Sequence, residues 1–254
     1  MLTHIQHDDG AILELNMARP PVNALNPELV KTLLEAIEAA PGQGAKAIVL
    51  SGQPGMFSAG LDVPALLPLD KDQMLAFWKD FSGLMGAIAR SPIPVASALT
   101  GHSPAGGAVL ALFGDVRIMA EGDFKIGLNE VRVGLTLPPV ILKAFQRQLG
   151  NRVAEQYAVA GFMASPDQAL EAGLVDQLVP ADKVVETAIT WCRERLALPP
   201  QAMAATRAFA RRDLVQLFDE LDDAADQAFL DVWFSDETRG TMQALVESLK
   251  NKKK

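Results

Sequence analysis

The sequence GHSPAGG at residues 101–107 follows an apolar run at residues 93–99, and FSAGLD at residues 57–62 follows another at residues 47–50. Each pair predicts a buried strand that ends in a glycine-bearing loop. Backbone N–H groups in two such loops can point toward a common oxygen atom and stabilise negative charge on it. A nearby carboxylate can move a proton, and Glu130 in the sequence GLNE is the candidate. The combination predicts chemistry through an enolate, with no metal and no nucleophilic side chain.

The composition is that of an ordinary globular protein. The 254 residues are 49% hydrophobic and 21% charged, which allows a buried core in one large or two modest domains. The net charge of −8 argues against nucleic-acid binding, because phosphate neutralisation needs clustered Lys and Arg. The basic run at residues 250–254 is expected to be a solvated tail. The absence of a long apolar run and of a signal-like N-terminus predicts no membrane helix and a cytoplasmic location.

Other catalytic motifs find little support in the sequence. His4, His7 and His102 show no ligand spacing, so no metal site is expected. The serine within residues 55–60 comes one place too late for a G-x-S-x-G nucleophile motif, and no glycine pattern fits a dinucleotide or phosphate loop. His102 stands next to a serine, where a loop or packing role is expected. Cys192, the single cysteine, is expected to be a small buried hydrophobe in a reducing compartment.

Strand and helix signals alternate up to about residue 180, and only helix signals follow. This order predicts an α/β core over residues 1–195 and a helical C-terminal region over residues 196–254. The expected strands are residues 12–17, 46–51, 93–99, 115–120 and 174–179. The expected helices begin after Asn26, at residues 70, 105, 138 and 151, and at the capping box that starts at Ser165.

Glu130 differs from the other acidic residues in its neighbours. Residues 124–128 before it and residues 131–137 after it are largely apolar. A carboxylate in such a setting should be partly desolvated, which raises its pKa toward the range useful for a general base. A surface acid at the end of a short strand is the alternative that the residues alone leave open.

The two loops and the GLNE sequence resemble those of the crotonase superfamily, the enoyl-CoA hydratase/isomerase family. Residues 57–62 are similar to the family's first oxyanion loop, and the resemblance makes Leu61 the backbone N–H donor. The sequence PAGG at residues 104–107 is similar to the second loop, whose donor falls on Gly106. By the same resemblance, Glu130 is the catalytic acid–base group.

Two further segments resemble the family and extend the match over roughly residues 10 to 180. Residues 19–25 are similar to an early segment that contacts coenzyme A, and residues 169–176 to a late family motif. The resemblance implies an α/β spiral of ββα units, followed by helices that form homotrimers, which in the family often pair into hexamers. It also implies an acyl-CoA thioester substrate, with no separate cofactor. The implied substrate-binding residues are Ala24, Ala59, Gly60 and Asn129.

One departure from the family pattern narrows the expected reaction. Family hydratases have two glutamates, and the position three residues after the oxyanion glycine is Val109 in this chain. A single glutamate resembles the Δ3,Δ2-enoyl-CoA isomerases, which implies conversion of a 3-enoyl-CoA to the 2-trans-enoyl-CoA in fatty-acid β-oxidation. A hydratase or another acyl-CoA enzyme stays open, as does a non-catalytic acyl-CoA-binding scaffold. Arg19 and Lys71 are candidates for contacts with the coenzyme A phosphates.

Overall fold

A six-stranded sheet forms the base of the protein in the computed structural model, which describes residues 1–251. The strand order is β1-β2-β3-β5-β7-β9. β1 pairs antiparallel with β2, and the other neighbours are parallel. The strands are β1 (Leu2–His7), β2 (Ile12–Met17), β3 (Ala47–Ser51), β5 (Val95–Leu99), β7 (Val116–Ala120) and β9 (Gln177–Val179).

A second, three-stranded parallel sheet carries the glycine-bearing segments. It consists of β4 (Gly55–Met56), β6 (Gly101–Pro104) and β8 (Ile126–Gly127). These strands follow β3, β5 and β7 along the chain, and each is followed in turn by one or more helices. The chain therefore repeats a strand–strand–helix unit, which places three chain segments side by side above the large sheet.

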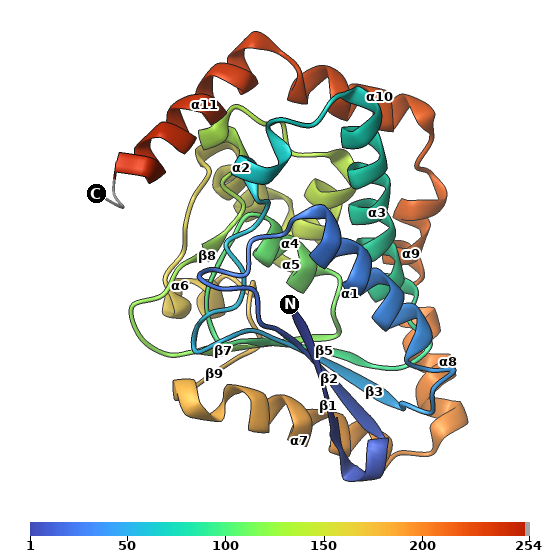
Figure 1. Ribbon diagram of the computed structural model, residues 1–254. Coiled ribbons are helices and arrows are strands. Elements are labelled where there is room, and N and C mark those ends of the chain that lie inside the picture. Colours follow the sequence, from blue (N-terminus) through green and yellow to red (C-terminus); the bar gives the residue numbers. More distant parts are fainter. Residues whose placement is uncertain (252–254) are drawn as a thin grey trace.

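Helices cover both faces of the large sheet (Figure 1). On one face, Val184, Ala188 and Cys192 of α7 pack against strand residues such as Val49 and Ile118. On the other face, alternate strand residues join the main core with the helices between the sheets and the C-terminus. The helices are α1 (Pro27–Ala39), α2 (Val63–Leu66), α3 (Lys71–Arg90), α4 (Gly106–Leu112), α5 (Pro139–Ala160), α6 (Pro166–Glu171), α7 (Val184–Leu196), α8 (Pro200–Ala210), α9 (Arg212–Asp219), α10 (Asp223–Trp233) and α11 (Asp236–Asn251), with short 3-10 helices η1 (Asp8–Gly10), η2 (Glu130–Val133) and η3 (Ala181–Lys183).

The helix starts expected after Asn26 and Ser165 are confirmed. The Asn26 side chain accepts the N–H of Leu29 at 3.0 Å, and Ser165 forms both hydrogen bonds of its capping box. The two helices expected on either side of Gly150 are one element, α5, which has a break at this glycine. Cys192 is buried as expected, and burial raises the pKa of its thiol to about 12.

Several strand expectations were wrong in extent. β1 was not expected; it is an edge strand whose side chains are mostly exposed, so it lacks the apolar alternation that marks a half-buried strand. Residues 101–104, expected to be loop, form β6. The last strand begins at Gln177 and not at residue 174. After residue 183 the described elements are all helices, as expected. The expected domain boundary at residue 195 stays a prediction. Residues 252–254 of the basic run lie outside the described residues.

The C-terminal helices return over the core and close one side of the site. Phe229 of α10 stacks on Trp78 of α3, with ring centroids 3.8 Å apart and planes 11° from parallel. The Thr238 hydroxyl of α11 donates to the Gly134 carbonyl at 2.6 Å, just after η2. Figure 1 shows α10 and α11 lying across the helices that follow the small sheet. The C-terminal helices α10 and α11 therefore pack against α3 and the segment after η2, which lie far from them in the sequence.

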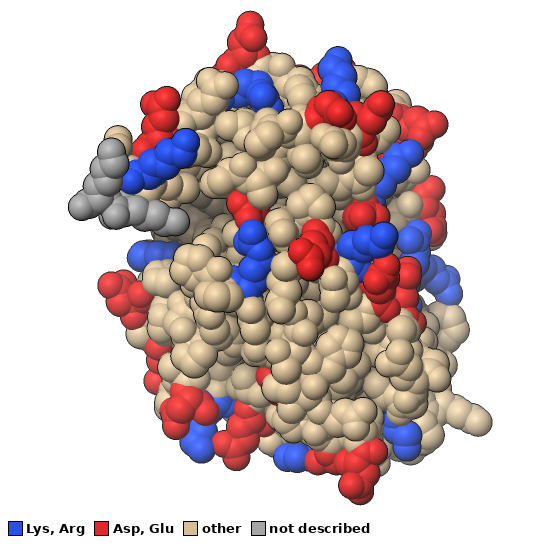
Figure 2. Space-filling view, in the orientation of Figure 1, with Lys and Arg blue, Asp and Glu red and all other residues tan. Residues whose placement is uncertain are grey.

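The outer surface carries mixed charge. On the face shown in Figure 2, the described Lys and Arg side chains are interspersed with Asp and Glu and leave broad uncharged areas between them. Within residues 1–251, no helix combines the length and the apolar character that crossing a bilayer requires.

We predict that Gly101→Ala disrupts the small sheet, whereas Gly240→Ala is tolerated. A Cβ on Gly101 would lie 2.0 Å from the backbone carbon of Gly55 on the neighbouring strand, which should cost roughly 3 kcal/mol or more. A Cβ on Gly240, within α11, meets nothing within 4 Å and should stabilise the helix by about 1 kcal/mol. Urea unfolding of both variants measures these changes. Equal effects of the two substitutions would contradict the packing described for β4 and β6.

Candidate active site

Two glycine-bearing loops meet at Gly60 and Gly106. A Cβ on Gly60 would lie 2.8 Å from the Gly106 nitrogen, and a Cβ on Gly106 would lie 3.1 Å from the Gly60 Cα. Gly60 also has a φ of +83°, a conformation that favours glycine. Any side chain at either position would therefore push the loops apart. The contact brings the backbone of Leu61 next to the start of α4.

Two backbone N–H groups, those of Leu61 and Gly106, point away from the loops that contain them. Leu25 bridges the loop by donating to the Gly60 carbonyl and accepting from the Asp62 N–H, at 2.8 and 3.1 Å, so the Leu61 N–H between them points to the opposite side. The Gly106 N–H belongs to the first residue of α4, where N–H groups have no partner within the helix. Ala105 before it has φ 46° and ψ −121°, a strained conformation for a residue with a side chain.

The segment at residues 19–25 supports the first loop. Ala59 N–H donates to the Val22 carbonyl at 2.9 Å, and the Ser58 hydroxyl donates to the Asn23 carbonyl at 2.8 Å. Asn23 is fully buried and donates from its side chain to the Phe57 carbonyl at 3.0 Å. These bonds fix the path of the loop up to Gly60.

Ala24 and Arg19 take part in this support and do not line the cavities at Glu130. The Ala24 carbonyl accepts from the Arg19 guanidinium at 3.0 Å, and Arg19 also forms an ion pair with Asp62 at 2.6 Å. Lys71, the other candidate for phosphate contacts, lies at the first position of α3 with its Nζ 6.0 Å from the centre of the Phe234 ring. Arg19, expected as a candidate for contacts with the coenzyme A phosphates, therefore already has an acidic partner in Asp62.

An apolar inner cavity brings the expected donors and the carboxylate together. Its volume is about 20 Å³, enough for about one water molecule. Leu61, Gly106, Val109 and Glu130 line one part of it. Glu130 is the only ionisable side chain among the described residues that line it. The rest of the wall consists of Trp78, Phe81, Leu135, Thr136, Pro138, Ile141 and Phe229.

A second, outer cavity meets the inner one at Leu61, Glu130 and Leu135. Its volume is about 160 Å³, and its lining includes Ala59, Asn129 and Leu245 of α11. Glu130 is again the only ionisable side chain among the described residues that line it.

The Glu130 carboxyl is desolvated, as its apolar neighbours in the sequence suggest. Its Oε2 is shielded from solvent and has no hydrogen-bond partner among the described residues, and the same holds for Asn129 Oδ1. Burial in these surroundings raises the pKa of Glu130 to about 7. The alternative of an ordinary solvated surface acid is therefore wrong. Two buried polar atoms without partners mark a place where a ligand can supply hydrogen bonds.

His102 lies outside both cavities. It is part of β6, where its Nδ1 accepts the Lys125 N–H at 3.1 Å and its ring packs edge-on against Phe124. The expected packing role is confirmed. His7, which lies on β1, pairs with the buried Glu14 at 2.9 Å. Residues 1–251 contain no group of three or more His, Cys, Asp or Glu side chains arranged to hold a metal ion.

The sequence did not identify most of the cavity walls. Trp78 and Phe81 were expected to face inward on their helix, and the helical spacing could have suggested a common wall. Phe229 and Leu245 come from C-terminal helices, and no local pattern indicates that these helices fold back onto the loops. Leu135 lies outside any helix or strand and touches both cavities.

Comparisons with known proteins agree with the fold. The family model described as enoyl-CoA hydratase/isomerase matches residues 7–254. The human protein named enoyl-CoA delta isomerase 1, mitochondrial is 31% identical over 253 residues, which cover 98% of this chain and 84% of that protein. A probable enoyl-CoA hydratase, EchA17, from Mycobacterium bovis (strain BCG / Pasteur 1173P2) is 30% identical over 201 residues, covering 79% and 77% of the two chains.

The crystal structure of human mitochondrial delta3-delta2-enoyl-CoA isomerase superposes with a TM-score of 0.94 at 29% identity, covering 100% of this chain and 99% of that one. The chain belongs to the enoyl-CoA hydratase/isomerase family. The crotonase-like α/β fold predicted from the two loops is confirmed.

We predict that Glu130→Gln stabilises the protein more at pH 8 than at pH 5. The folded pKa of about 7 lies above the ordinary value of 4.5, so between these values the folded state binds more protons than the unfolded state. The unfolding free energy of the unsubstituted protein therefore falls as the pH rises through this window. The advantage of the glutamine variant should grow by on the order of 2 kcal/mol between the two pH values. Urea unfolding at both pH values measures it, and a constant difference would contradict the burial of the carboxylate.

Proposed function

We propose that this member of the enoyl-CoA hydratase/isomerase family is a Δ3,Δ2-enoyl-CoA isomerase. The observation that carries the proposal is the single carboxylate at the junction of the two cavities. Glu130 is the only ionisable group among the described residues that line them, and Val109 faces the same inner cavity. Shifting a double bond needs one group that removes a proton and returns it elsewhere. The names of the human relatives, both of them isomerases, support the same activity.

The two loop donors would stabilise the charge that forms during the reaction. In the proposed complex, the thioester oxygen accepts hydrogen bonds from the N–H groups of Leu61 and Gly106. When a proton leaves C2, the electron pair moves toward the carbonyl and the oxygen becomes negative. Donors held in place by the fold need no reorganisation at that moment, and one such donor is typically worth about 10²–10³ in turnover.

Glu130 would carry the proton in both steps. As the ionised base it takes a proton from C2 of the 3-enoyl-CoA, which leaves a dienolate conjugated over C1 to C4. It then returns the proton to C4, the double bond settles between C2 and C3, and the carboxylate is regenerated. A pKa of about 7 suits both steps, because acid and base forms are then close in free energy near neutral pH. Asn129, whose Oδ1 is buried beside it, would position the substrate or the carboxylate.

Water addition is the alternative reaction on the same scaffold. It needs an oxygen nucleophile that is positioned and activated, as well as a proton donor. Val109 can neither hold nor activate this water, and Glu130, the only ionisable side chain among the described residues that line the inner cavity, would have to activate the water and also supply the proton. Because mycobacterial relatives are named as probable hydratases, the assay below measures hydration as well as isomerisation.

The remaining expectations are part of the same proposal. The substrate would bring coenzyme A as its own thioester group, with no separate cofactor, and the reaction would belong to fatty-acid β-oxidation. The substrate-binding roles expected for Ala59, Gly60 and Asn129 fit their places at or beside the cavities, whereas Ala24 would act through the supporting segment. Homotrimer formation by the C-terminal helices and a cytoplasmic location stay predictions, and the human relative is named as mitochondrial.

We predict that Glu130→Gln lowers isomerase turnover by roughly 10²–10⁴, because the amide cannot accept the C2 proton. The measurement is formation of 2-trans-hexenoyl-CoA from 3-hexenoyl-CoA, run beside hydration of crotonyl-CoA. The unsubstituted protein should isomerise much faster than it hydrates. Glu171→Gln, a substitution at an exposed position on α6, is the control and should change neither rate. Near-native isomerisation by Glu130→Gln would refute the assignment, and efficient hydration without isomerisation would favour the hydratase.

We also predict the pH dependence of kcat/KM. Only the ionised carboxylate can act as the base, so kcat/KM for 3-hexenoyl-CoA should rise about tenfold per pH unit below 7 and level off above it. The pKa of the free protein sets this midpoint. A midpoint near 4.5, the ordinary pKa of a glutamate, would mean that a different, solvated carboxylate limits the reaction.

A further inference from the structure

The position of the Glu130 carboxylate depends on the backbone that carries it. Its Oε2 has no hydrogen-bond partner among the described residues, so no bond at this atom fixes the side chain. Glu130 is the first residue of η2, and its backbone carbonyl accepts the Leu135 N–H at 3.0 Å, which closes the segment into a compact turn. Whatever holds η2 in place therefore also places the carboxylate in the cavity.

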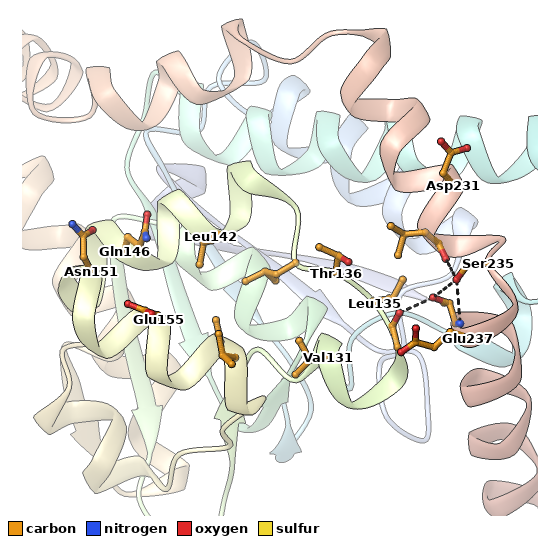
Figure 3. A pocket seen from close by; sticks show the side chains of 16 residues that line it. Val131, Leu135, Thr136, Leu142, Gln146, Asn151, Glu155, Asp231, Ser235 and Glu237 are labelled. Carbon is orange, nitrogen blue, oxygen red and sulfur yellow. Dashed lines mark hydrogen bonds between the residues drawn. The ribbon is translucent and has the colours of Figure 1, made fainter.

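The start of α11 holds the far end of η2. Gly134 ends η2 with a φ of +76°, and a Cβ on it would lie 3.1 Å from the Thr238 Cα, so the two backbones are in close contact. Thr238 is fully buried, and its hydroxyl lies 2.6 Å from the Gly134 carbonyl. A carbonyl can only accept, so the Thr238 hydroxyl donates, and the Ser235 hydroxyl can donate to Thr238 from 3.0 Å away. Figure 3 shows these hydrogen bonds as dashed lines at Ser235.

The next residue of α11 holds the segment that follows the first loop. Arg239 Nη1 donates to the Leu67 carbonyl at 2.7 Å. Leu67 ends α2, the short helix that begins two residues after Leu61. The Arg239 guanidinium also lies over the Phe234 ring, with its central carbon 5.6 Å from the ring centre. Arg239 therefore links α11 to the chain that continues from Leu61.

We propose that Thr238 and Arg239 are positioning residues for the proposed reaction. From consecutive places at the start of one helix, they hold the segment that begins with Glu130 and the segment that continues from Leu61 at a fixed separation. A site of this kind works only when such supporting bonds keep its groups within about 0.5 Å of the productive geometry. The inference rests on the proposed function, because that function uses Glu130 as the base and the Leu61 N–H as a donor to the same substrate.

The expected effect falls on turnover and not on substrate binding. Neither Thr238 nor Arg239 is among the residues that line the two cavities, so each acts through the backbone that it binds. A base or a donor that is displaced by a fraction of an ångström loses an interaction made only in the transition state. Such a loss lowers kcat and leaves KM nearly unchanged.

Three substitutions on α11 separate the hydroxyl group from packing. Thr238→Val keeps the size of the side chain and removes the hydroxyl, and kcat for 3-hexenoyl-CoA should fall roughly tenfold while KM changes by less than about twofold. Thr238→Ser keeps the hydroxyl and loses a buried methyl group, and should retain kcat within about threefold. Thr241→Val is the matched control, since this hydroxyl donates to the Glu237 carbonyl of its own helix at 2.8 Å, and should change neither parameter. Equal losses of kcat in the two Thr238 variants would make packing the cause and overturn the role of the hydroxyl.

A substitution at Arg239 tests the second link and does not depend on how well the Thr238 variants fold. Arg239→Met removes the bond to Leu67, and kcat should fall about fivefold with KM nearly unchanged. The double variant Thr238→Val/Arg239→Met should lose less than the product of the two single losses, because one broken link already frees the two segments from each other. Single losses that multiply, or an unchanged kcat in Arg239→Met, would overturn the shared role.

Hydrogen exchange measured by mass spectrometry tests the hold on η2 without turnover. The Leu135 N–H donates to the Glu130 carbonyl, so a peptide that covers residues 130–136 reports on η2. Thr238→Val should speed exchange in this peptide by roughly tenfold, because local opening no longer breaks the bond from α11. Thr241→Val should not change it. Unchanged exchange in Thr238→Val would overturn the hold on η2, whatever the activity.

The isomerase assay separates this inference from the proposed function. If the unsubstituted protein isomerises 3-hexenoyl-CoA, and Thr238→Val and Arg239→Met retain its kcat, the proposed function stands and the positioning role is refuted. If exchange responds to Thr238→Val as expected while no 3-enoyl-CoA is isomerised by the unsubstituted protein, the hold of α11 on η2 stands and the isomerase is refuted.

Discussion

The contact between the backbones of Gly60 and Gly106 is the constraint on which the site depends. Neither residue has room for a Cβ, so the two loops approach more closely than side chains would allow. Hydrogen bonds from residues 19–25 hold one loop, and the strand pairs β4-β6 and β6-β8 hold the other in register. Leu61 and Gly106 consequently line the same cavity as Glu130. The repeated strand–strand–helix unit provides the frame that this contact requires.

Burial of Glu130 makes its carboxylate a stronger base and lowers the stability of the folded protein at neutral pH. A carboxylate in water would have its pKa near 4.5 and would be a weak base at neutral pH, whereas burial raises the pKa to about 7. The C-terminal helices produce that burial: Phe229 of α10 closes the inner cavity, and Leu245 of α11 closes the outer one. These helices therefore form part of the site, in addition to any role in assembly.

Local patterns in the sequence predicted local structure well. Side chains such as Asn26 and Ser165 cap helices through residues three positions away, so a short stretch contains the whole signal. The two-residue strands β4 and β8 were not predicted, because they are too short to show periodicity and form only when distant segments align. The position of Phe229 over the loops was likewise missed, since it depends on tertiary packing across some 150 residues of chain. The loops and Glu130 could be recognised because each is one continuous segment.

If Glu130 is the single acid–base group, one buried carboxylate moves a proton from C2 to C4 of the same substrate molecule. Glu130 Oε2 is shielded from solvent, so a deuteron that it accepts should be returned before it exchanges with water. Isomerisation of 3-hexenoyl-CoA carrying two deuterium atoms at C2, followed by mass spectrometry and NMR of the 2-trans-hexenoyl-CoA product, measures this transfer directly. We expect a substantial fraction of the product to carry deuterium at C4. A product with no deuterium at C4, in which the added hydrogen comes from solvent alone, would contradict this transfer.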